Sequence, residues 1–230
     1  MEQTKGVYKR SDGRWEARYK KGVGPDGRAK YGAVYGASKE EVIKKREAIA
    51  PSSTEIVYPT ELNLLILGAG SHGRDVMEIA ESLHIFNKIK FLDDVAQGDN
   101  IIGKCSEAAS LRSEYPCAFV AVGDNKKRKK LATYLKTHHF LIPKLVSPTA
   151  TISSNADIGE GTVVMSQANV GSCKIGDFCI IAPSCVISSD VVMENNVRID
   201  TGAIIARDSY LPCNTWVKSG EIYSKKRQTA

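Results

Sequence analysis

The C-terminal third of the chain has a hydrophobic period of six residues. Large aliphatic or methionine residues recur at this interval, with one interval of five after Val170: Ile152, Ile158, Val164, Val170, Ile175, Ile181, Ile187, Met193, Ile199, Ile205 and Leu211. After all but Val170, a small or β-branched residue follows four positions later. In a parallel β-helix, three short strands close each coil and stacked coils bury an apolar column. The repeated aliphatic positions and the repeated small positions together predict a left-handed β-helix of hexapeptide type over residues 148–223, in preference to a β-sandwich of short strands.

The same repeat accounts for several glycines and cysteines. Gly159 and Gly176 directly follow an aliphatic residue, where we expect a corner that needs positive φ. Cys179 and Cys185 occupy the small-residue position, so the repeat explains them without a disulfide or a metal. Because the six cysteines form no CxxC pair, we expect reduced thiols and no metal site.

A strand, a glycine-rich turn and a helix follow one another in the middle of the chain. Residues 62–67 form an apolar, β-favouring run, and the motif GAGSHG at residues 68–73 leads into an amphipathic helical pattern over residues 74–83. In this context a GxGxxG motif binds phosphate through backbone N–H groups and the helix dipole. The pattern predicts a Rossmann-like βαβ half-fold over residues 61–147.

Polar residues follow the next two predicted strands. The strand at residues 89–92 ends in acidic residues that can accept ribose hydroxyls, and the strand at 118–122 leads into a basic helix start. The candidate substrate-binding residues are therefore Gly68, Gly70, Ser71, His72, Gly73, Asp93, Asp94, Gly123 and Asn125. Two alternatives stay open: the glycines only pack the helix against the strand, and His72 is a local cap. An NAD-dependent dehydrogenase is disfavoured, because only one mononucleotide-binding half fits before the β-helix.

The first fifty residues form a separate pattern, which we expect to be a domain over residues 1–52. Alternating runs at residues 7–10, 14–21 and 29–35 predict three strands. Ser38 and Glu41 form a capping box that opens a helix over residues 39–50. The stretch at residues 51–60, with its Ser-Ser-Thr and two prolines, is expected to be a linker.

The net charge is concentrated in this front part. Residues 1–57 carry 13 Lys and Arg against 8 Asp and Glu, which is +5 of the total +6. Arg14, Trp15, Arg18 and Lys20 on the predicted sheet resemble the arm-type DNA-binding domain of tyrosine recombinases, and this resemblance implies DNA as a partner. The alternative is a small docking module with Trp15 and Tyr19 in a minimal core, and a surface that is merely well solvated.

The overall composition narrows the class of protein without naming it. Hydrophobic residues make up 42% of the chain and charged residues 25%, as in an ordinary globular protein. No apolar run approaches the roughly 20 residues that a membrane span needs. The first residues also lack the apolar core of a secretory signal, so we expect a cytoplasmic protein without membrane contact.

The order of the motifs resembles one bacterial family. The segments LGAGSHG, FLDD and AVGDNKKR precede the hexapeptide repeat, as in sialic acid O-acetyltransferases and UDP-4-amino-sugar N-acetyltransferases. The likeness covers residues 62–223, about 70% of the chain. It implies acetyl-CoA as the donor, a nucleotide-linked sugar held by the half-fold, and a homotrimer with acyl sites between neighbouring β-helices.

The resemblance also implies catalytic residues, and here the chain departs from the family. Members typically carry His-Asp in one turn of the β-helix, with the histidine as general base, whereas Ser189 and Asp190 occupy that turn by register. The acyl-CoA candidates are Gly202, Ala206 and Arg207, in turns where the family usually offers glycine at residue 206 or 207. The sequence predicts a sugar O- or N-acetyltransferase, impaired by Ser189, with a non-catalytic trimeric scaffold that binds a nucleotide sugar, DNA or another partner as the alternative.

Overall fold

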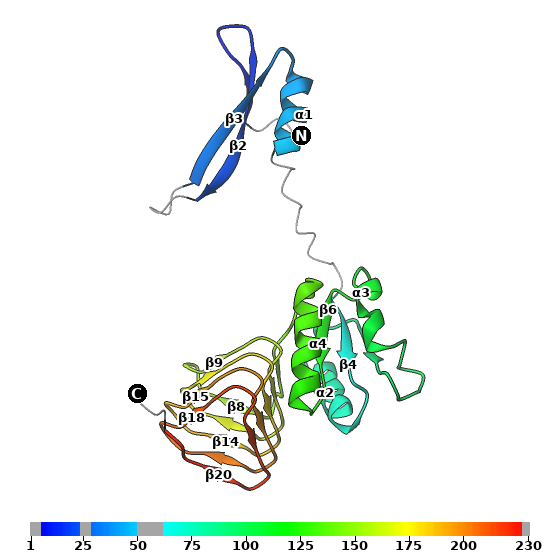
Figure 1. Cartoon of the computed structure of the whole chain (residues 1–230), viewed down its shortest axis with the longest axis vertical. Helices are drawn as coiled ribbons and strands as arrows, with labels where there is room; N and C mark the ends of the chain where they lie inside the picture. Colours follow the sequence, from blue (N-terminus) through cyan, green and yellow to red (C-terminus); the bar gives the residue numbers. More distant parts are fainter. Residues whose placement is uncertain (1–5, 24–28, 50–61, 227–230) are drawn as a thin grey trace. The chain divides into compact units, whose positions relative to one another are not determined.

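The computed structural model describes residues 6–23, 29–49 and 62–226, and the chain divides into two units, Met1–Thr60 and Glu61–Ala230. In the first unit, β1 (Val7–Lys9), β2 (Trp15–Val23) and β3 (Ala29–Gly36) form an antiparallel sheet beside α1 (Lys39–Ile49), as shown in Figure 1. The predicted three strands and helix are confirmed. The predicted linker at residues 51–60 and the side chain of Lys20 lie outside the described part of the chain.

Alternation along β2 gives the small sheet two different faces. Ala17 is buried with Val34 and Val42, and Trp15 and Tyr19 pack against this small core. Trp15 therefore lies on the side of the sheet that faces the small core, as expected for a docking module rather than for a DNA-contacting residue. Arg18 lies on the opposite face of the sheet. Ser38 caps α1 by accepting a hydrogen bond from the Glu41 N–H at 3.1 Å.

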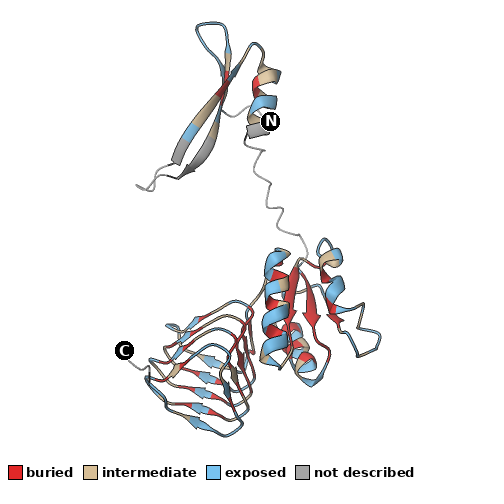
Figure 2. Cartoon of the chain, viewed as in Figure 1, coloured by how far each residue is buried: buried red, intermediate tan, exposed pale blue. Residues whose placement is uncertain are grey.

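The second unit begins with a three-stranded parallel sheet of order β5-β4-β6. Its elements are β4 (Asn63–Leu67), α2 (Ser71–Ser82), β5 (Lys88–Leu92), a 3₁₀ turn (Cys105–Glu107), α3 (Ala108–Leu111), β6 (Cys117–Val120) and α4 (Asn125–Thr137). Every residue of β4 and β6 is buried, as the red strands of Figure 2 show. A parallel sheet covered on both faces needs such continuous apolar strands, and the predicted Rossmann-like half-fold is confirmed.

The rest of this unit is a parallel β-helix of two-residue strands. They are β7 (Leu145–Val146), β8 (Thr151–Ile152), β9 (Asp157–Ile158), β10 (Val163–Val164), β11 (Asn169–Val170), β12 (Lys174–Ile175), β13 (Ile180–Ile181), β14 (Val186–Ile187), β15 (Val192–Met193), β16 (Arg198–Ile199), β17 (Ile204–Ile205), β18 (Tyr210–Leu211), β19 (Trp216–Val217) and β20 (Ile222–Tyr223). They stack into three sheets, which we call face I (β7-β10-β13-β16-β19), face II (β8-β11-β14-β17-β20) and face III (β9-β12-β15-β18).

The register of the coils follows the hydrophobic period. The second residue of each strand points inward, and Ile181, Ile199 and Ile205 are fully buried. Strands normally pair with the strand 18 residues on, as Leu145 does with Val163. Pairs that span the short interval after Val170 are 17 residues apart instead, as in Val163 with Ile180. A one-residue deletion is thus absorbed in one turn without changing which residues face inward.

The predicted corner geometry is wrong in one respect. Positive φ occurs three residues after the inward aliphatic residue, at positions such as Phe178 (φ 55°) and Asn196 (φ 61°), and not at Gly159 or Gly176. These two glycines are needed because coils approach closely: a Cβ on Gly159 would lie 2.5 Å from the backbone of Gly176. The requirement is therefore steric rather than conformational.

Two of the cysteines occupy the positions in the repeat that were predicted for them. All six cysteines are free, and five of them are buried, with Cys213 exposed. Cys179 and Cys185 occupy the interior small-residue positions, and burial raises the pKa of Cys179 to about 12. These thiols are therefore protonated core residues.

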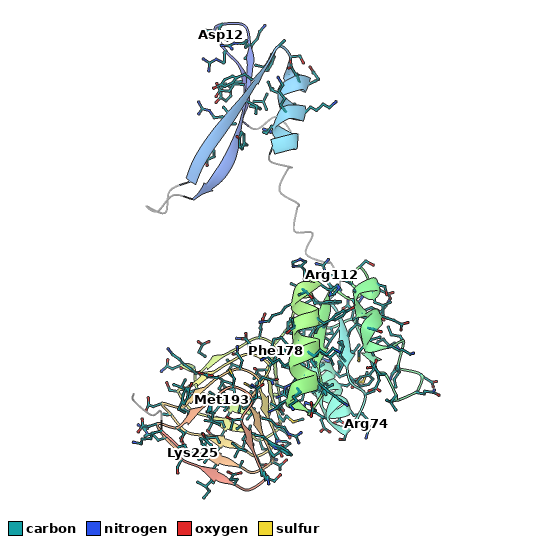
Figure 3. All side chains as sticks on the ribbon, viewed as in Figure 1. Asp12, Arg74, Arg112, Phe178, Met193 and Lys225 are labelled. Carbon is teal, nitrogen blue, oxygen red and sulfur yellow. The ribbon has the colours of Figure 1, made fainter. Side chains whose placement is uncertain are left out.

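One buried arginine joins the half-fold to the β-helix. Arg128 of α4 is 1% exposed and donates to the carbonyl oxygens of Phe178 (Nε, 2.9 Å) and Asn196 (Nη2, 3.0 Å) on the β-helix. It also donates to the turn after β6, at the carbonyls of Val122 and Gly123. Phe178, labelled in Figure 3, packs in the same core cluster as α4 residues. The two parts of the unit are thus held in one arrangement. Among the described residues no helix could cross a membrane.

Candidate active site

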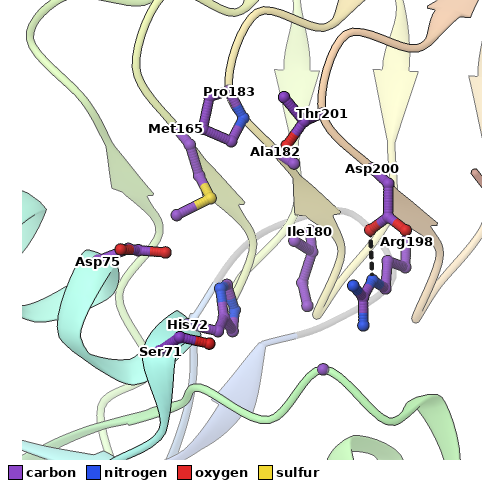
Figure 4. A pocket seen from close by; sticks show the side chains of 11 residues that line it. Ser71, His72, Asp75, Met165, Ile180, Ala182, Pro183, Arg198, Asp200 and Thr201 are labelled. Carbon is purple, nitrogen blue, oxygen red and sulfur yellow. Dashed lines mark hydrogen bonds and ion pairs between the residues drawn. The ribbon is translucent and has the colours of Figure 1, made fainter. Parts of the chain in front are cut away.

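A cavity of about 180 Å³ lies between the first turn of α2 and face I of the β-helix. Figure 4 shows the residues that line it: Ser71, His72, Asp75, Gly123, Met165, Ile180, Ala182, Pro183, Arg198, Asp200 and Thr201. Three of the predicted substrate-binding residues, Ser71, His72 and Gly123, meet here. Pockets for whole drug-sized ligands start at roughly 300 Å³, so the cavity accommodates part of a nucleotide sugar rather than all of it.

The three glycines of the motif have different roles. Gly68 has φ +110°, and a Cβ there would lie 2.7 Å from the Ala121 carbonyl oxygen. A Cβ on Gly73 would lie 2.0 Å from the Gly68 carbonyl oxygen, so this glycine lets α2 approach β4. Gly70 has ordinary φ, and a Cβ there would meet nothing within 4 Å. The fold itself requires Gly68 and Gly73, whereas the space beside Gly70 is open.

His72 presents an unpaired nitrogen in the cavity lining. Its Nε2 is buried and has no hydrogen-bond partner among the described residues. Burial, with the nearby charges of Arg128 and Arg198, lowers the pKa of His72 to about 4. The imidazole is therefore neutral at pH 7. Within the described part of the chain no side chain caps the start of α2, so His72 makes no capping hydrogen bond there, and its contact with a ligand stays a prediction.

The carboxylates after β5 are occupied by backbone groups. Asp93 accepts hydrogen bonds from the N–H groups of Ala69 (2.7 Å), Val95 (2.9 Å) and Ala96 (2.8 Å). Burial raises the pKa of Asp93, but these three donors outweigh it and hold the pKa below its usual value. Asp94 accepts from the Cys105 N–H at 3.0 Å. Asp93 thus shapes the glycine-rich turn, and contact of either residue with a ribose stays a prediction.

Asn125 also makes contacts within the protein. Its Nδ2 donates to the Asn214 carbonyl at 2.8 Å, and its Oδ1 accepts from Arg128. Asn125 therefore belongs to the joint between the half-fold and the β-helix, and it does not line the cavity.

The predicted catalytic pair lies at a different corner of the coil. Ser189 and Asp190 follow β14 on face II, and Asp190 forms an ion pair with Arg207 at 3.0 Å. Ser189 lies against Gly171 of the preceding coil, where a Cβ would be 3.0 Å from the Ser189 hydroxyl oxygen. Ala206 and Arg207 occupy the same corner one coil later, whereas Gly202 follows face I. None of these five residues lines the cavity.

Sequence analysis missed Arg198 and Asp200. Both come from the face I strand β16 and the turn after it, and their side chains form an ion pair at 2.6 Å. The signal was present in the repeat. The outward position of face I is apolar and buried in β7, β10 and β13, and it changes to arginine in β16.

Comparison with known proteins reveals the family. Residues 63–135 match the family model described as PglD N-terminal domain. GDP-perosamine N-acetyltransferase of Escherichia coli O157:H7 is 28% identical over 172 residues, 61% of this chain and 76% of that protein. UDP-N-acetylbacillosamine N-acetyltransferase of Bacillus subtilis is 32% identical over 45% of this chain and 51% of its own length.

A solved structure extends this match across both parts of the second unit. The acetyltransferase domain of PglB from Neisseria gonorrhoeae, in complex with acetyl coenzyme A, has a TM-score of 0.69 at 30% identity. The match covers 72% of this chain and 83% of that domain. The fold and this match thus define an acyltransferase built on a left-handed β-helix. Within that class, the chain belongs to the family of acetyl-CoA-dependent sugar acetyltransferases.

Proposed function

We propose that this protein transfers an acetyl group from acetyl-CoA to an amino group of a nucleotide-linked sugar. The observation that carries the proposal is the cavity in which the glycine-rich turn and His72 face the β-helix, within a chain of this family. Relatives matched along most of their length are named as N-acetyltransferases, which favours an amine over a hydroxyl acceptor. Acetyl-CoA supplies the activated acetyl thioester.

The glycine-rich turn and His72 are proposed to bind different parts of the nucleotide-linked sugar. The open space beside Gly70 suits a phosphate of the nucleotide. The N–H groups in the first turn of a helix, which lack an intrahelical acceptor, suit it as well. The neutral His72 imidazole suits a hydrogen bond to the sugar. Its low pKa makes it an orienting partner rather than an efficient base, since a general base works best with a pKa near the working pH.

The residues present are compatible with acetyl-CoA. Gly202 has open space where a Cβ would lie, and Arg207 is an exposed cation on the outside of the β-helix. Arg207 is held beside Asp190, so the predicted catalytic turn shares one corner of the coil with Ala206 and Arg207, whereas Gly202 lies at the corner after face I. We propose that Gly202, Ala206 and Arg207 contact the donor and that Ser189 and Asp190 lie beside the acceptor.

A complete site then needs a second copy of this chain. The cavity lies on face I, whereas Ser189 and Asp190 follow face II. Face II also exposes an apolar stripe on three successive coils, formed by Val186 (38% exposed), Ile204 (39%) and Ile222 (68%). We propose that this stripe packs against a neighbouring copy in a trimer, so that two chains form each site. Sedimentation should give three times 25.0 kDa for the wild type, and Ile204→Glu should give monomers.

The test is a transfer assay. The protein is incubated with isotope-labelled acetyl-CoA and a panel of UDP- and GDP-linked 4-amino sugars, and mass spectrometry follows the label into the sugar. We expect transfer to at least one acceptor, loss of transfer in Gly70→Val, and no change in the exposed control Ser113→Val. Ser189→His should raise turnover by restoring a base. Absence of transfer by both the wild type and Ser189→His, with donor and sugar bound, would refute the proposal.

A second candidate function, binding of duplex DNA, is favoured by the open face of the N-terminal sheet. Glu16, only 4% exposed, accepts hydrogen bonds from Arg10 (2.7 Å), Arg18 (2.9 Å) and Tyr8 (3.0 Å). Arg10 and Arg18, with Tyr8, lower the pKa of Glu16 to about 2. Arg10 lies 5.3 Å from the ring centre of Tyr35. One carboxylate thus orders a basic, aromatic surface of the kind that contacts phosphates.

This candidate is tested by gel shift at several salt concentrations. Each lost phosphate contact should reduce the slope of log affinity against log salt by about 0.9. Arg18→Gln should do so, whereas Lys44→Gln, an exposed change on α1, should not. A wild-type protein that shifts no duplex at low salt refutes DNA binding and leaves the acetyltransferase proposal intact.

A further inference from the structure

Arg198 is held in the cavity wall by two neighbours on the β-helix. Its Nε donates to Asp200 Oδ1 at 2.6 Å, and Trp216 Nε1 donates to Asp200 Oδ2 at 2.7 Å. The guanidinium carbon lies 5.2 Å from the ring centre of Trp216. Both carboxylate oxygens of Asp200 therefore accept a hydrogen bond. Asp200 and the Trp216 ring together fix the plane of the Arg198 guanidinium. The side chain of Arg198 is 31% exposed and that of Asp200 is 15% exposed.

The terminal amino groups of Arg198 have no partner of their own. Within the described part of the chain, neither Nη1 nor Nη2 makes a hydrogen bond, because the one bond that Arg198 donates comes from Nε. Nη1 lies so close to the turn after β6 that a Cβ on Gly123 would be 2.6 Å from it. In Figure 4 the guanidinium faces the cavity on the side away from Asp75, the other carboxylate of the lining.

The arrangement suits one kind of ligand group. A guanidinium whose Nε is already anchored presents its two Nη groups to a planar or tetrahedral oxyanion. His72 across the cavity is neutral, so the positive charge of this lining comes from Arg198. Gly123 keeps the approach clear, since any side chain there would meet Nη1.

We infer that Arg198 binds an anionic group of the acceptor, either a phosphate of the nucleotide or a carboxylate on the sugar. The identity of the ligand rests on the proposed function, whereas the anion position rests on the geometry alone. Asp200 and Trp216 are positioning residues for Arg198. The β-helix thus contributes a cation that contacts the ligand from the side opposite the glycine-rich turn.

The test is calorimetric titration of the full chain with matched probes. Inorganic pyrophosphate and glucuronate test the anion position without a nucleotide, and UDP, UDP-glucose and UDP-glucuronate test it with one. The variants are Arg198→Gln, Arg198→Lys and Asp200→Asn. Lys174→Gln, which removes an exposed charge from face III, is the control. Thermal unfolding establishes that each variant is folded.

Two results would support the inference and would identify the source of the anion. A loss of about tenfold or more in pyrophosphate and UDP affinity in Arg198→Gln, with Lys174→Gln unchanged, would indicate a phosphate. A loss of that size confined to glucuronate and UDP-glucuronate would indicate a sugar carboxylate. In either case Asp200→Asn should weaken binding in the same direction, because it frees the guanidinium, and Arg198→Lys should rescue only part of the loss.

The contrary results separate the two proposals. If no probe that binds the wild type is weakened in Arg198→Gln, or if no probe binds at all, the inference is overturned. If pyrophosphate or glucuronate binds through Arg198 while the nucleotide adds no affinity, the inference stands. That result would count against a nucleotide-linked acceptor.

Discussion

Replacement of Arg128 tests how the half-fold is joined to the β-helix. The side chain is buried without a carboxylate partner among the described residues, and it donates five hydrogen bonds, four to backbone carbonyls and one to Asn125 Oδ1. Arg128→Met keeps most of the volume but removes every donor. The acceptors from the β6–α4 turn and from the β-helix are then left without this partner.

The expected loss follows from two opposing effects. Hydrogen bonds from a charged donor contribute about 1.5 kcal/mol or more each, so five give at least about 7 kcal/mol. Burial of the charge opposes this gain and lowers the pKa of Arg128 to about 10. That shift from 12.5 corresponds to a cost of about 3 kcal/mol. We therefore expect Arg128→Met to destabilise the second unit by about 4 kcal/mol.

The assay is urea unfolding combined with hydrogen exchange. Exchange should accelerate on both sides of the joint, near Gly123 on the half-fold and near Phe178 and Asn196 on the β-helix. Lys130→Met, an exposed change on the same helix, should stay within about 0.5 kcal/mol of the wild type. An Arg128→Met protein as stable as Lys130→Met would refute the reasoning, because the buried charge would then offset its own hydrogen bonds.

Three further predictions concern single residues. Because the pKa of His72 is about 4 in the fold and 6.5 unfolded, only the unfolded chain gains a proton as the pH falls through this window. Stability should therefore drop by up to about 3 kcal/mol between pH 6.5 and 4 in excess of the drop in His72→Gln, as measured by urea unfolding at each pH. Gly73→Ala should cost about 2 kcal/mol or more and Gly70→Ala about 0.5 or less, since only the first Cβ clashes; equal costs would contradict the roles assigned to the two glycines. Glu16→Gln should unfold the N-terminal sheet at lower denaturant than the exposed control Glu40→Gln, as hydrogen exchange of β1 and β2 would show.

The β-helix could be predicted because its interior repeats. Each inward residue meets the same environment in every coil, so the six-residue period alone identifies Ile181, Ile187 and their equivalents as core. The positive-φ corner at Asn196 and Asp208 was not visible in this way, because asparagine and aspartate tolerate the left-handed region without glycine. The sequence instead suggested positive φ at Gly159 and Gly176, although the role of these two glycines is close packing.

The candidate site was predicted only from one side. A glycine-rich turn between a strand and a helix carries its signal locally, so Gly70, Ser71 and His72 could be found in sequence. Arg198 and Asp200 lie more than a hundred residues further on and reach the cavity only because face I packs on the half-fold. The change to arginine in β16 is visible in the repeat, but it does not reveal which part of the chain this arginine meets. That contact depends on how the half-fold packs on face I, which the buried Arg128 fixes.

The N-terminal sheet shows the same limit on a smaller scale. Alternation correctly gave the strands, but the choice of which face meets α1 decides whether Trp15 is core or surface. That choice depends on packing against Val42 of a later helix. Glu16, which accepts hydrogen bonds from Arg10 and Arg18, could not be recognised as a site residue from the sequence. Its role arises from the pairing of neighbouring strands.

Calorimetric titration with acetyl-CoA tests the central claim most directly. An acetyltransferase must hold its donor, and this chain carries Arg207 and Ala206 where the family resemblance leads one to expect glycine. We predict binding at micromolar strength that is weakened in Arg207→Glu and retained in Gly70→Val, because the donor and acceptor positions are separate. A folded protein that gives no heat with acetyl-CoA, alone or with a nucleotide sugar present, would contradict the account.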